Sequence, residues 1–347
     1  MNPAAEWPEK ITSEEQLDEL LTRPSPSLIE IMGRMAGHIT VLGIGGKMGV
    51  TLGMLAVRAI CEARAHRRII GVSRFSDPAA RQKLHTCGVE TIPCDLLDQD
   101  AVADLPRTEN VIFMAGRKFG TESGEALTWA MNTAVPANVA QHFRDSRIVA
   151  FSTGCVYPIV PSTGGCTEQT KPAPVGEYAQ SCLGRERVFQ YYSAANATPV
   201  CLFRLNYSID LRYGVLHDIA TKVWHNKPVD VTAGHFNCIW QGDANTVALR
   251  CLEHCASPAA VLNVTGPETL STREVAEAFG RIMDRPARFT GKESDMAYLS
   301  NSAKATRLFG EPTVSVDQMI AWNAHWVMAG GRSLGKPTHF EVTDGNY

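Results

Sequence analysis

The 347-residue sequence has no apolar run that approaches the roughly 20 residues of a membrane-spanning helix. Its first residues, MNPAAEWPEKITSEEQ, contain neither the basic nor the apolar region of a secretory signal. Lysine and arginine form no basic stripe, and the formal net charge is −3, which argues against a nucleic-acid partner. We therefore expect a cytoplasmic protein that binds a small molecule.

The cysteines also lack the spacing that structural or metal sites require. Ten are present and no two have CxxC spacing, so they do not predict a disulfide framework. Cys251 and Cys255 share one helix face but supply too few ligands for zinc, and His235 has no second ligand at helix or strand spacing. The sequence predicts buried, reduced thiols and no metal site.

Short apolar strands that alternate with helices are present instead. We expect strands at 38–46, 67–75, 89–96, 110–116, 146–154 and 198–205, and helices at 47–65, 77–88, 99–105, 125–145 and 178–195. Such strands are typical of a parallel sheet covered by helices on both faces. The predicted fold class is α/β, a doubly wound parallel (Rossmann) sheet with a smaller C-terminal substrate-binding lobe.

The order of these elements predicts four segments. Residues 1–37, in which Ser13 and Gln16 have capping-box spacing, are expected to form a helical arm outside the main fold. Residues 38–205 form the dinucleotide-binding domain. Residues 206–330 form the substrate lobe, with elements that return to the main sheet, and residues 331–347 form a tail on the surface or on a partner.

The stretch GIGGKMG lies between the first expected strand and a long helix. Gly43, Gly46 and Gly49 have three-residue spacing there, with Lys47 and Met48 between the last two. A tight turn of glycines lets the backbone approach a pyrophosphate, and the helix N-terminus that follows attracts the anion. We interpret this turn as the cofactor-binding site of a dinucleotide.

The end of the second strand indicates which dinucleotide binds. An acidic residue there would accept the ribose hydroxyls of NAD. Ser73 and Arg74 stand at this position, and Arg81 follows in the next helix. A hydroxyl and guanidinium groups suit a 2′-phosphate, so the sequence favours NADP over NAD.

Several further stretches resemble one known family. They are STGCVYP after the fifth strand, CDLLD after the third, MAG after the fourth, YAQSCLGRE, RLNYSIDLRYG and NVTGPETLSTREVAEAFG. Together with the glycine turn they make residues 38 to 328 similar to the extended short-chain dehydrogenase/reductases, the NAD-dependent epimerase/dehydratase group. The resemblance implies a nicotinamide cofactor and a carbohydrate or carbohydrate-derived substrate.

The resemblance also implies roles for single residues. Asp95 and Leu96 correspond to residues along the adenine, and Ala115 and Gly116 to residues against the cofactor's ribose and pyrophosphate. Thr153 corresponds to the residue that hydrogen-bonds the reacting oxygen. Tyr178 corresponds to the catalytic tyrosine, a general acid or base on the substrate hydroxyl or carbonyl.

The sequence departs from the family at Cys182, where the family has a lysine that lowers the tyrosine pKa. A unit charge about 5 Å away changes a pKa by about two units, so tyrosinate should be scarce in this chain. Arg185 and Lys118 are candidate substitutes. Three outcomes stay open: catalysis by neutral Tyr178, catalysis with another cation, or dinucleotide binding without turnover.

The substrate side is expected to include residues around the second lobe. The candidates are Lys118, Cys155, Arg204, Asn206, Arg212, Tyr213 and His235. The family's basic residue for a nucleotide diphosphate is missing from this region, which leaves room for a smaller, non-nucleotide polyol. The alternative functions are a non-redox lyase or isomerase, or a dinucleotide-binding regulator or scaffold, and a homodimer is expected.

Overall fold

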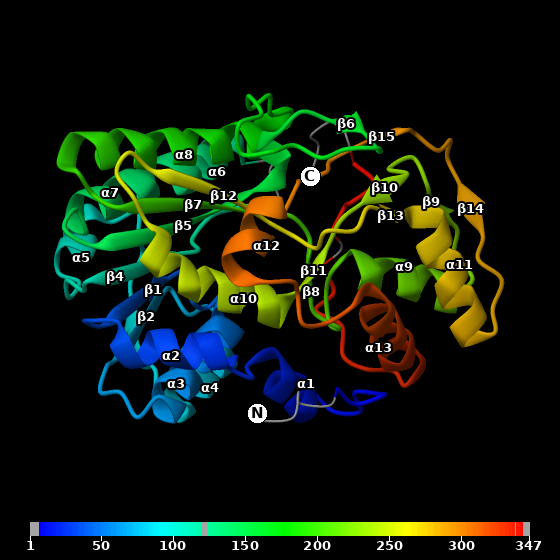
Figure 1. Ribbon diagram of the computed structural model, residues 1–347, viewed down its shortest axis with the longest axis horizontal. Coiled ribbons are helices and arrows are strands. Elements are labelled where there is room, and N and C mark those ends of the chain that lie inside the picture. The colour runs from blue at the N-terminus through cyan, green and yellow to red at the C-terminus, as the bar shows by residue number, and fades with distance from the viewer. Residues whose placement is uncertain (1–6, 119–123, 337, 343–347) are drawn as a thin grey trace.

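A seven-stranded parallel sheet forms the centre of the larger part of the molecule (Figure 1). The computed structural model describes residues 7–118, 124–336 and 338–342. The strand order is β12-β7-β5-β4-β1-β2-β3, with β1 at Ile39–Leu42, β2 at Ile69–Ser73, β3 at Glu90–Pro93, β4 at Asn110–Phe113, β5 at Arg147–Thr153, β7 at Val200–Leu205 and β12 at Ala260–Val264. The doubly wound parallel sheet predicted from the sequence is confirmed.

Helices cover both faces of this sheet. On one face lie α2 (Pro26–Arg34), α3 (Gly49–Glu62), α4 (Pro78–Thr86), α10 (Gln241–Arg250) and α12 (Ala303–Phe309), and on the other lie α5 (Gln99–Ala103), α7 (Val135–His142) and α8 (Gly176–Asn196) (Figure 1). Leu55 of α3 and Leu249 of α10 share a core with the strands on the first face. Val139 of α7 and Phe189 of α8 do so on the second face. Both faces are therefore buried, as a parallel sheet requires.

The smaller part of the molecule packs beside the sheet and has its own apolar core. Its helices are α1 (Glu14–Leu21), α9 (Val215–Trp224), α11 (Thr272–Met283) and α13 (Val316–Met328). Its short strands pair as β8 (Ser208–Ile209) with β11 (Ile239–Trp240), β9 (Val229–Asp230) with β14 (Phe289–Thr290), and β10 (His235–Phe236) with β13 (Leu270–Ser271). A further pair, β6 (Val160–Pro161) with β15 (Met296–Ala297), lies beside it. No helix in the described ranges has the length and apolarity to cross a membrane.

The helix expected at 125–145 is interrupted. It consists of α6 (Glu125–Trp129), a π-helical turn at Ala130–Ala134, and α7, whose first turn contains Pro136. Proline has no N–H and its ring collides with the carbonyl four residues earlier, so a regular helix cannot pass through it. The π-helical turn absorbs this defect and holds Asn132 in a fully buried position.

The N-terminal arm does not lie outside the main fold, which corrects the prediction for residues 1–37. Leu17 and Leu21 of α1 are buried in the core of the smaller part, while Leu28 and Met32 of α2 are buried against the sheet. The arm therefore belongs to both cores of its own chain, because both of its helices carry an apolar face that must be covered. Residues 1–6 lie outside the described residues.

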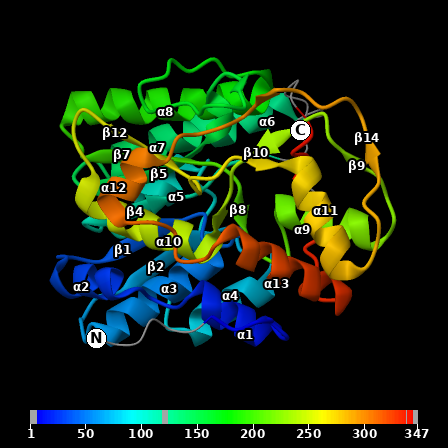
Figure 2. The same ribbon diagram turned by 45° about the vertical axis from the view of Figure 1, so that its right-hand side comes forward.

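The C-terminal segment is also buried in part, although a surface tail was expected. Phe340 is 3% exposed and packs in the core of the smaller part, where its ring centre lies 6.3 Å from that of Phe236 in β10. Thr338 is 2% exposed, and its N–H and hydroxyl both donate to Asp218 of α9, at 2.7 and 2.5 Å. The chain thus returns between β10 and α9 (Figure 2). Residues 337 and 343–347 lie outside the described residues.

Candidate active site

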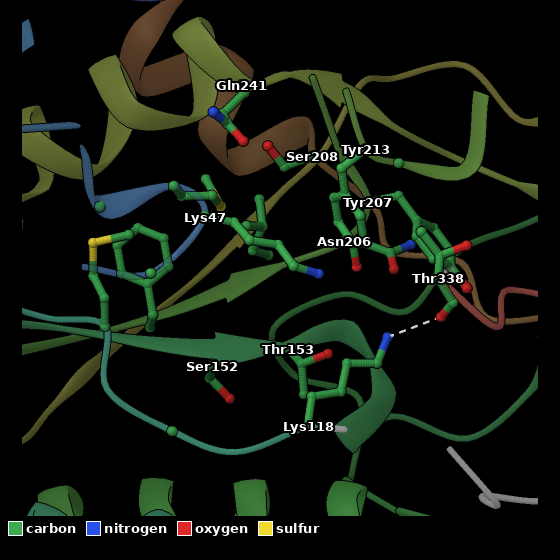
Figure 3. Close-up of a pocket in the computed structure, with 18 of the residues that line it drawn as sticks. Lys47, Lys118, Ser152, Thr153, Asn206, Tyr207, Ser208, Tyr213, Gln241 and Thr338 are labelled. Carbon is green, nitrogen blue, oxygen red and sulfur yellow. Dashed lines mark hydrogen bonds between the residues drawn. The ribbon is translucent and has the colours of Figure 1, made fainter. Parts of the chain in front are cut away.

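A cavity of about 350 Å³ opens at the carboxyl ends of β1, β4 and β5, where the sheet meets the smaller part (Figure 3). In doubly wound sheets this edge is where ligands bind. Its walls come from both parts of the molecule and consist of Gly43, Gly46, Lys47, Met48, Gly49, Met114, Gly116, Lys118, Phe151, Ser152, Thr153, Cys155, Tyr178, Leu205, Asn206, Tyr207, Ser208, Tyr213, Gly214, Gln241 and Thr338.

The glycine turn forms one wall of this cavity. Gly43 has φ +85°, and a Cβ there would lie 2.7 Å from the Ala115 nitrogen, so only glycine fits between β1 and β4. A Cβ at Gly49 would overlap the Ile44 carbonyl oxygen. The 14-residue helix α3 begins at Gly49 with no side-chain cap and no acidic residue in its first turn. Its N-terminal amides and dipole are therefore available to an anion, and the turn fits a dinucleotide pyrophosphate.

The end of β2 lies next to the turn. A Cβ at Gly45 would lie 2.8 Å from the Ser73 hydroxyl oxygen, so the two segments are in contact. Arg74 is exposed. Arg81 donates to the Thr91 hydroxyl at 3.2 Å and lies 5.6 Å from the centre of the Phe75 ring. One hydroxyl and two guanidinium groups thus surround this strand end.

The residues expected along the adenine lie outside the cavity. Asp95 is exposed, and its carboxylate accepts the Leu97 N–H at 3.1 Å. Leu96 is 5% exposed and its carbonyl accepts from Asn138 at 3.0 Å. Ala115 is buried against Gly43, and Gly116 reaches the cavity wall.

Thr153 and Tyr178 both line the cavity. Thr153 is the last residue of β5, and Tyr178 stands on the first turn of α8, half-buried. Burial raises the pKa of Tyr178 well above its ordinary value, Cys182 and Cys155 raise it further, and Arg185 lowers it in part. The phenol is therefore neutral at physiological pH.

Cys182 lies behind Tyr178 rather than in the cavity wall. It is 0% exposed and packs with Val156, Tyr157 and Cys166. Burial raises the pKa of its thiol to about 11, so it is protonated and uncharged near neutral pH. Cys182, a catalytic candidate by its place one helical turn after Tyr178, therefore lies next to the phenol without supplying a charge.

Arg185 comes closer to the site than its position seven residues beyond Tyr178 suggests. Its guanidinium donates to the Phe151 carbonyl at 2.8 Å and to the Asn132 side-chain oxygen at 2.5 Å. A Cβ at Gly116 would collide with this guanidinium, so the two groups touch. Side chains on a helix point toward its N-terminus, which brings the charge back toward Tyr178.

Two lysines also enter the cavity. Lys118 donates to the Thr338 carbonyl at 3.3 Å and lies 5.8 Å from the centre of the Tyr178 ring (Figure 3). Lys47 reaches from the glycine turn to the smaller part, where its ammonium lies 3.3 Å from the centre of the Tyr213 ring. Burial lowers the pKa of both, and the pKa of Lys47 falls to about 7 because Lys118 and Lys336 also repel its charge.

Three residues expected to contact the substrate lie elsewhere, which corrects those predictions. Arg204 is 3% exposed and forms a bidentate ion pair with Glu186, at 2.8 and 2.6 Å. Arg212 pairs with Asp210 at 2.8 Å and with Asp18 at 3.1 Å. His235 lies in β10, which pairs with β13. The two arginines are held by carboxylates, so they serve the packing of the protein.

Other expected residues are in the cavity wall, namely Cys155, Asn206 and Tyr213. The sequence analysis did not single out Ser152, Tyr207, Ser208, Gln241 or Thr338, which also line it. Tyr207 and Ser208 follow Asn206 directly, so the segment RLNYSID was the available signal. Gln241 and Thr338 lie far from any recognised motif, and only the folded chain brings them to this site.

The sheet order and the cavity at its carboxyl edge define a doubly wound protein of the Rossmann type. Residues 39–208 match the profile described as the NAD dependent epimerase/dehydratase family. This match confirms, over these residues, the resemblance found in the sequence. No curated protein sequence matches the chain.

Several solved structures are similar in fold. UDP-glucuronic acid 4-epimerase from Bacillus cereus, in complex with UDP-glucuronic acid and NAD, has TM-score 0.68 and 18% identity, covering 84% of this chain and 99% of that one. A dTDP-glucose 4,6-dehydratase from Streptomyces venezuelae, with NAD and TYD bound, has TM-score 0.71 and 18% identity, covering 84% and 97%. An epimerase from Methanothermobacter thermautotrophicus has TM-score 0.71 and 15% identity, covering 88% and 96%. At these identities the likeness establishes the fold.

Proposed function

We propose that the protein is an NAD(P)-dependent oxidoreductase of the epimerase/dehydratase type that acts on a hydroxyl or carbonyl group of a carbohydrate-like substrate. One observation carries the proposal: the glycine turn, Thr153 and Tyr178 line the same cavity. The family match over residues 39–208 and neighbours crystallised with NAD support it. The expected homodimer and cytoplasmic location stay predictions.

The backbone of the turn from Gly43 to Gly49 and the N-terminus of α3 would hold the coenzyme's pyrophosphate. Ser73 and Arg74, with Arg81 nearby, favour the 2′-phosphate of NADP, while Asp95 and Leu96 would lie toward the adenine. When bound, the nicotinamide supplies the capacity to give or take a hydride.

The chain's own residues would then transfer the proton to the substrate oxygen. Because the pKa of Tyr178 is raised well above its ordinary value, the phenol is a proton donor at neutral pH. As a carbonyl carbon is reduced, Tyr178 would give its proton to the carbonyl oxygen and regain one from solvent. Thr153 would hydrogen-bond the same oxygen. This arrangement favours the direction of reduction, and Arg185 limits the energetic penalty of the transient phenolate.

The test is Tyr178→Phe, which removes the proton donor and keeps the ring. We expect coenzyme affinity within about twofold of the original protein and turnover lowered by about 10² to 10⁴, measured by calorimetry and by absorbance at about 340 nm, the reduced-nicotinamide band. Thr153→Val should lower turnover in the same direction.

Other results would redirect the assignment. Retained turnover in the Tyr178→Phe protein would contradict its role as proton donor. Product formed without net coenzyme consumption would support an isomerase or lyase. Coenzyme binding without turnover over a panel of sugars would support a dinucleotide-binding regulator.

A further inference from the structure

The ammonium groups of Lys47 and Lys118 enter the cavity from different walls. Lys47 extends from the glycine turn to the Tyr213 ring, and Lys118 extends from the loop after β4 to the Thr338 carbonyl (Figure 3). Both ammonium groups therefore lie toward the smaller part of the molecule, away from the backbone of the turn that suits a coenzyme pyrophosphate. They stand on the side where a substrate would lie.

The lysines of this cavity make it positive when they are protonated. Among the described residues that line it, two are lysines and none is an aspartate or glutamate. Lys118 and the exposed Lys336 both lower the pKa of Lys47, so their charges act on one another, and Asp218 is the carboxylate that acts on both Lys47 and Lys118. Bringing like charges together is unfavourable, and an anion between them removes that penalty.

The position of Lys118 is fixed by buried groups. The Asn132 side chain accepts the Arg117 N–H and donates to the Arg117 carbonyl, each at 3.1 Å, and Asn132 is 0% exposed. At the other end, Thr338 is tied to Asp218 by its N–H and its hydroxyl. A lysine held at both ends is preorganised for a ligand.

The rest of the lining suits a small polyhydroxylated molecule. Hydroxyl or amide groups of Thr153, Asn206, Tyr207, Ser208 and Gln241 line the cavity. The Ser208 hydroxyl oxygen is buried and has no hydrogen-bond partner among the described residues, so a ligand can supply one. The glycine turn also lines this cavity of about 350 Å³, which is near the lower limit of ligand sites, so a bound coenzyme leaves room for only a small substrate.

We propose that the substrate is a small polyhydroxylated acid without a nucleotide, and that its carboxylate or phosphate group binds between Lys47 and Lys118. The inference rests on the proposed function and deepens it by naming the substrate class. Carboxylate and phosphate share the chemistry that two ammonium groups recognise, and the experiment separates them.

The test uses three probes that differ only at one carbon: glucose, glucuronate and glucose 6-phosphate. Each is titrated by calorimetry into the full-length protein saturated with coenzyme. We expect one acidic probe to bind at least about tenfold more tightly than glucose, and the preferred probe identifies the anionic group. UDP-glucuronate serves as the nucleotide-bearing comparison and should bind no more tightly than glucuronate.

Two variants and a control locate the effect. Lys47→Met and Lys118→Met should each weaken the acidic probe by about tenfold or more and leave glucose unchanged. Lys227→Met, at an exposed lysine after α9, should bind as the original protein does. Thermal unfolding of each variant shows whether it is folded. If a variant does not fold, the affinities of the original protein for the three probes still test the proposal.

The outcomes distinguish the two proposals. Coenzyme binding with equal affinity for glucose and both acidic probes, or with no binding of any acidic probe, overturns the anion site alone. Much tighter binding of UDP-glucuronate overturns the small-substrate assignment. Failure to bind either nicotinamide coenzyme overturns the proposed function itself.

Discussion

At the scale of single residues, the positive charge near Tyr178 does not come from the residue one helical turn later. The position four residues later, Cys182, is a buried neutral thiol. Arg185, which folds back to the Phe151 carbonyl, supplies positive charge there, and the Lys118 ammonium lies 5.8 Å from the centre of the Tyr178 ring. The sequence named both residues as candidate substitutes for the missing lysine, but their contacts depend on where the neighbouring strands end.

Lys47 gives a prediction of pH dependence. In the protein without an anion its pKa is about 7, so it is mostly charged below pH 7 and mostly neutral above it. Anion binding favours the charged form, so affinity should be greatest below pH 7 and fall by up to about tenfold per unit above it. Calorimetry with glucuronate from pH 6 to 9 measures this, since that carboxylate stays ionised throughout.

Several groups face Lys47 and bear on this result: Lys118, Lys336, Asp218 and Tyr213. The pKa of Lys118 is also lowered by burial, so it adds to the fall, while burial raises the pKa of Tyr213 and keeps its phenol neutral. In Lys47→Met the slope between pH 7 and 8 should be shallower. An affinity that rises with pH would contradict the role given to Lys47.

At the scale of elements, the C-terminal segment is part of the site. It follows two glycines, Gly330 and Gly331, and its sequence alone reads as a surface tail. The side chain of Phe340 nevertheless fills the core between β10 and α9 and brings Thr338 to the cavity. The apolar part of this anchor is a single aromatic residue, so sequence periodicity gave no sign of it.

Phe340→Ala should therefore loosen this segment. Removing a buried phenylalanine costs about 3 kcal/mol or more, which raises local opening on the order of a hundredfold. We expect faster trypsin cleavage after the exposed Arg332, followed by mass spectrometry, and weaker binding of the acidic probe. Tyr191→Ala, which alters an aromatic residue that is 67% exposed, is the control and should leave cleavage unchanged. Equal cleavage of the two variants would argue against anchoring by Phe340.

At the scale of the whole molecule, the N-terminal helices join the two parts. Helix α1 contributes to the core of the smaller part and α2 to the core beside the sheet. Arg58 of α3 donates to the Glu19 carbonyl at 2.9 Å, which ties the arm to the sheet's helices. The cavity lies between the two parts, so this arm helps to fix its walls.

Leu17→Ala tests that role. Leu17 is 0% exposed in the core of the smaller part, so the substitution should lower the free energy of unfolding by about 2 to 5 kcal/mol. Urea unfolding followed by tryptophan fluorescence measures it, since Trp322 and Trp240 share this core. The exposed Glu15→Ala is the control and should change stability little. A loss no larger than that of the control would place α1 outside the cooperative core.

The sequence by itself determined the sheet and one wall of the site. Strand and helix periodicity and the glycine turn are local properties, since backbone sterics and apolar alternation act over a few residues. Thr153 and Tyr178 were named from the family resemblance, which rests on the stretches STGCVYP and YAQSCLGRE.

The tertiary structure alone decided which charges meet. Arg204 and Arg212 looked like substrate contacts in the sequence, but the fold pairs them with Glu186 and Asp210. Lys47 and Lys118, 71 positions apart, were brought into one cavity with Thr338. Electrostatic partners depend on distance in space and on burial, and a linear sequence carries neither.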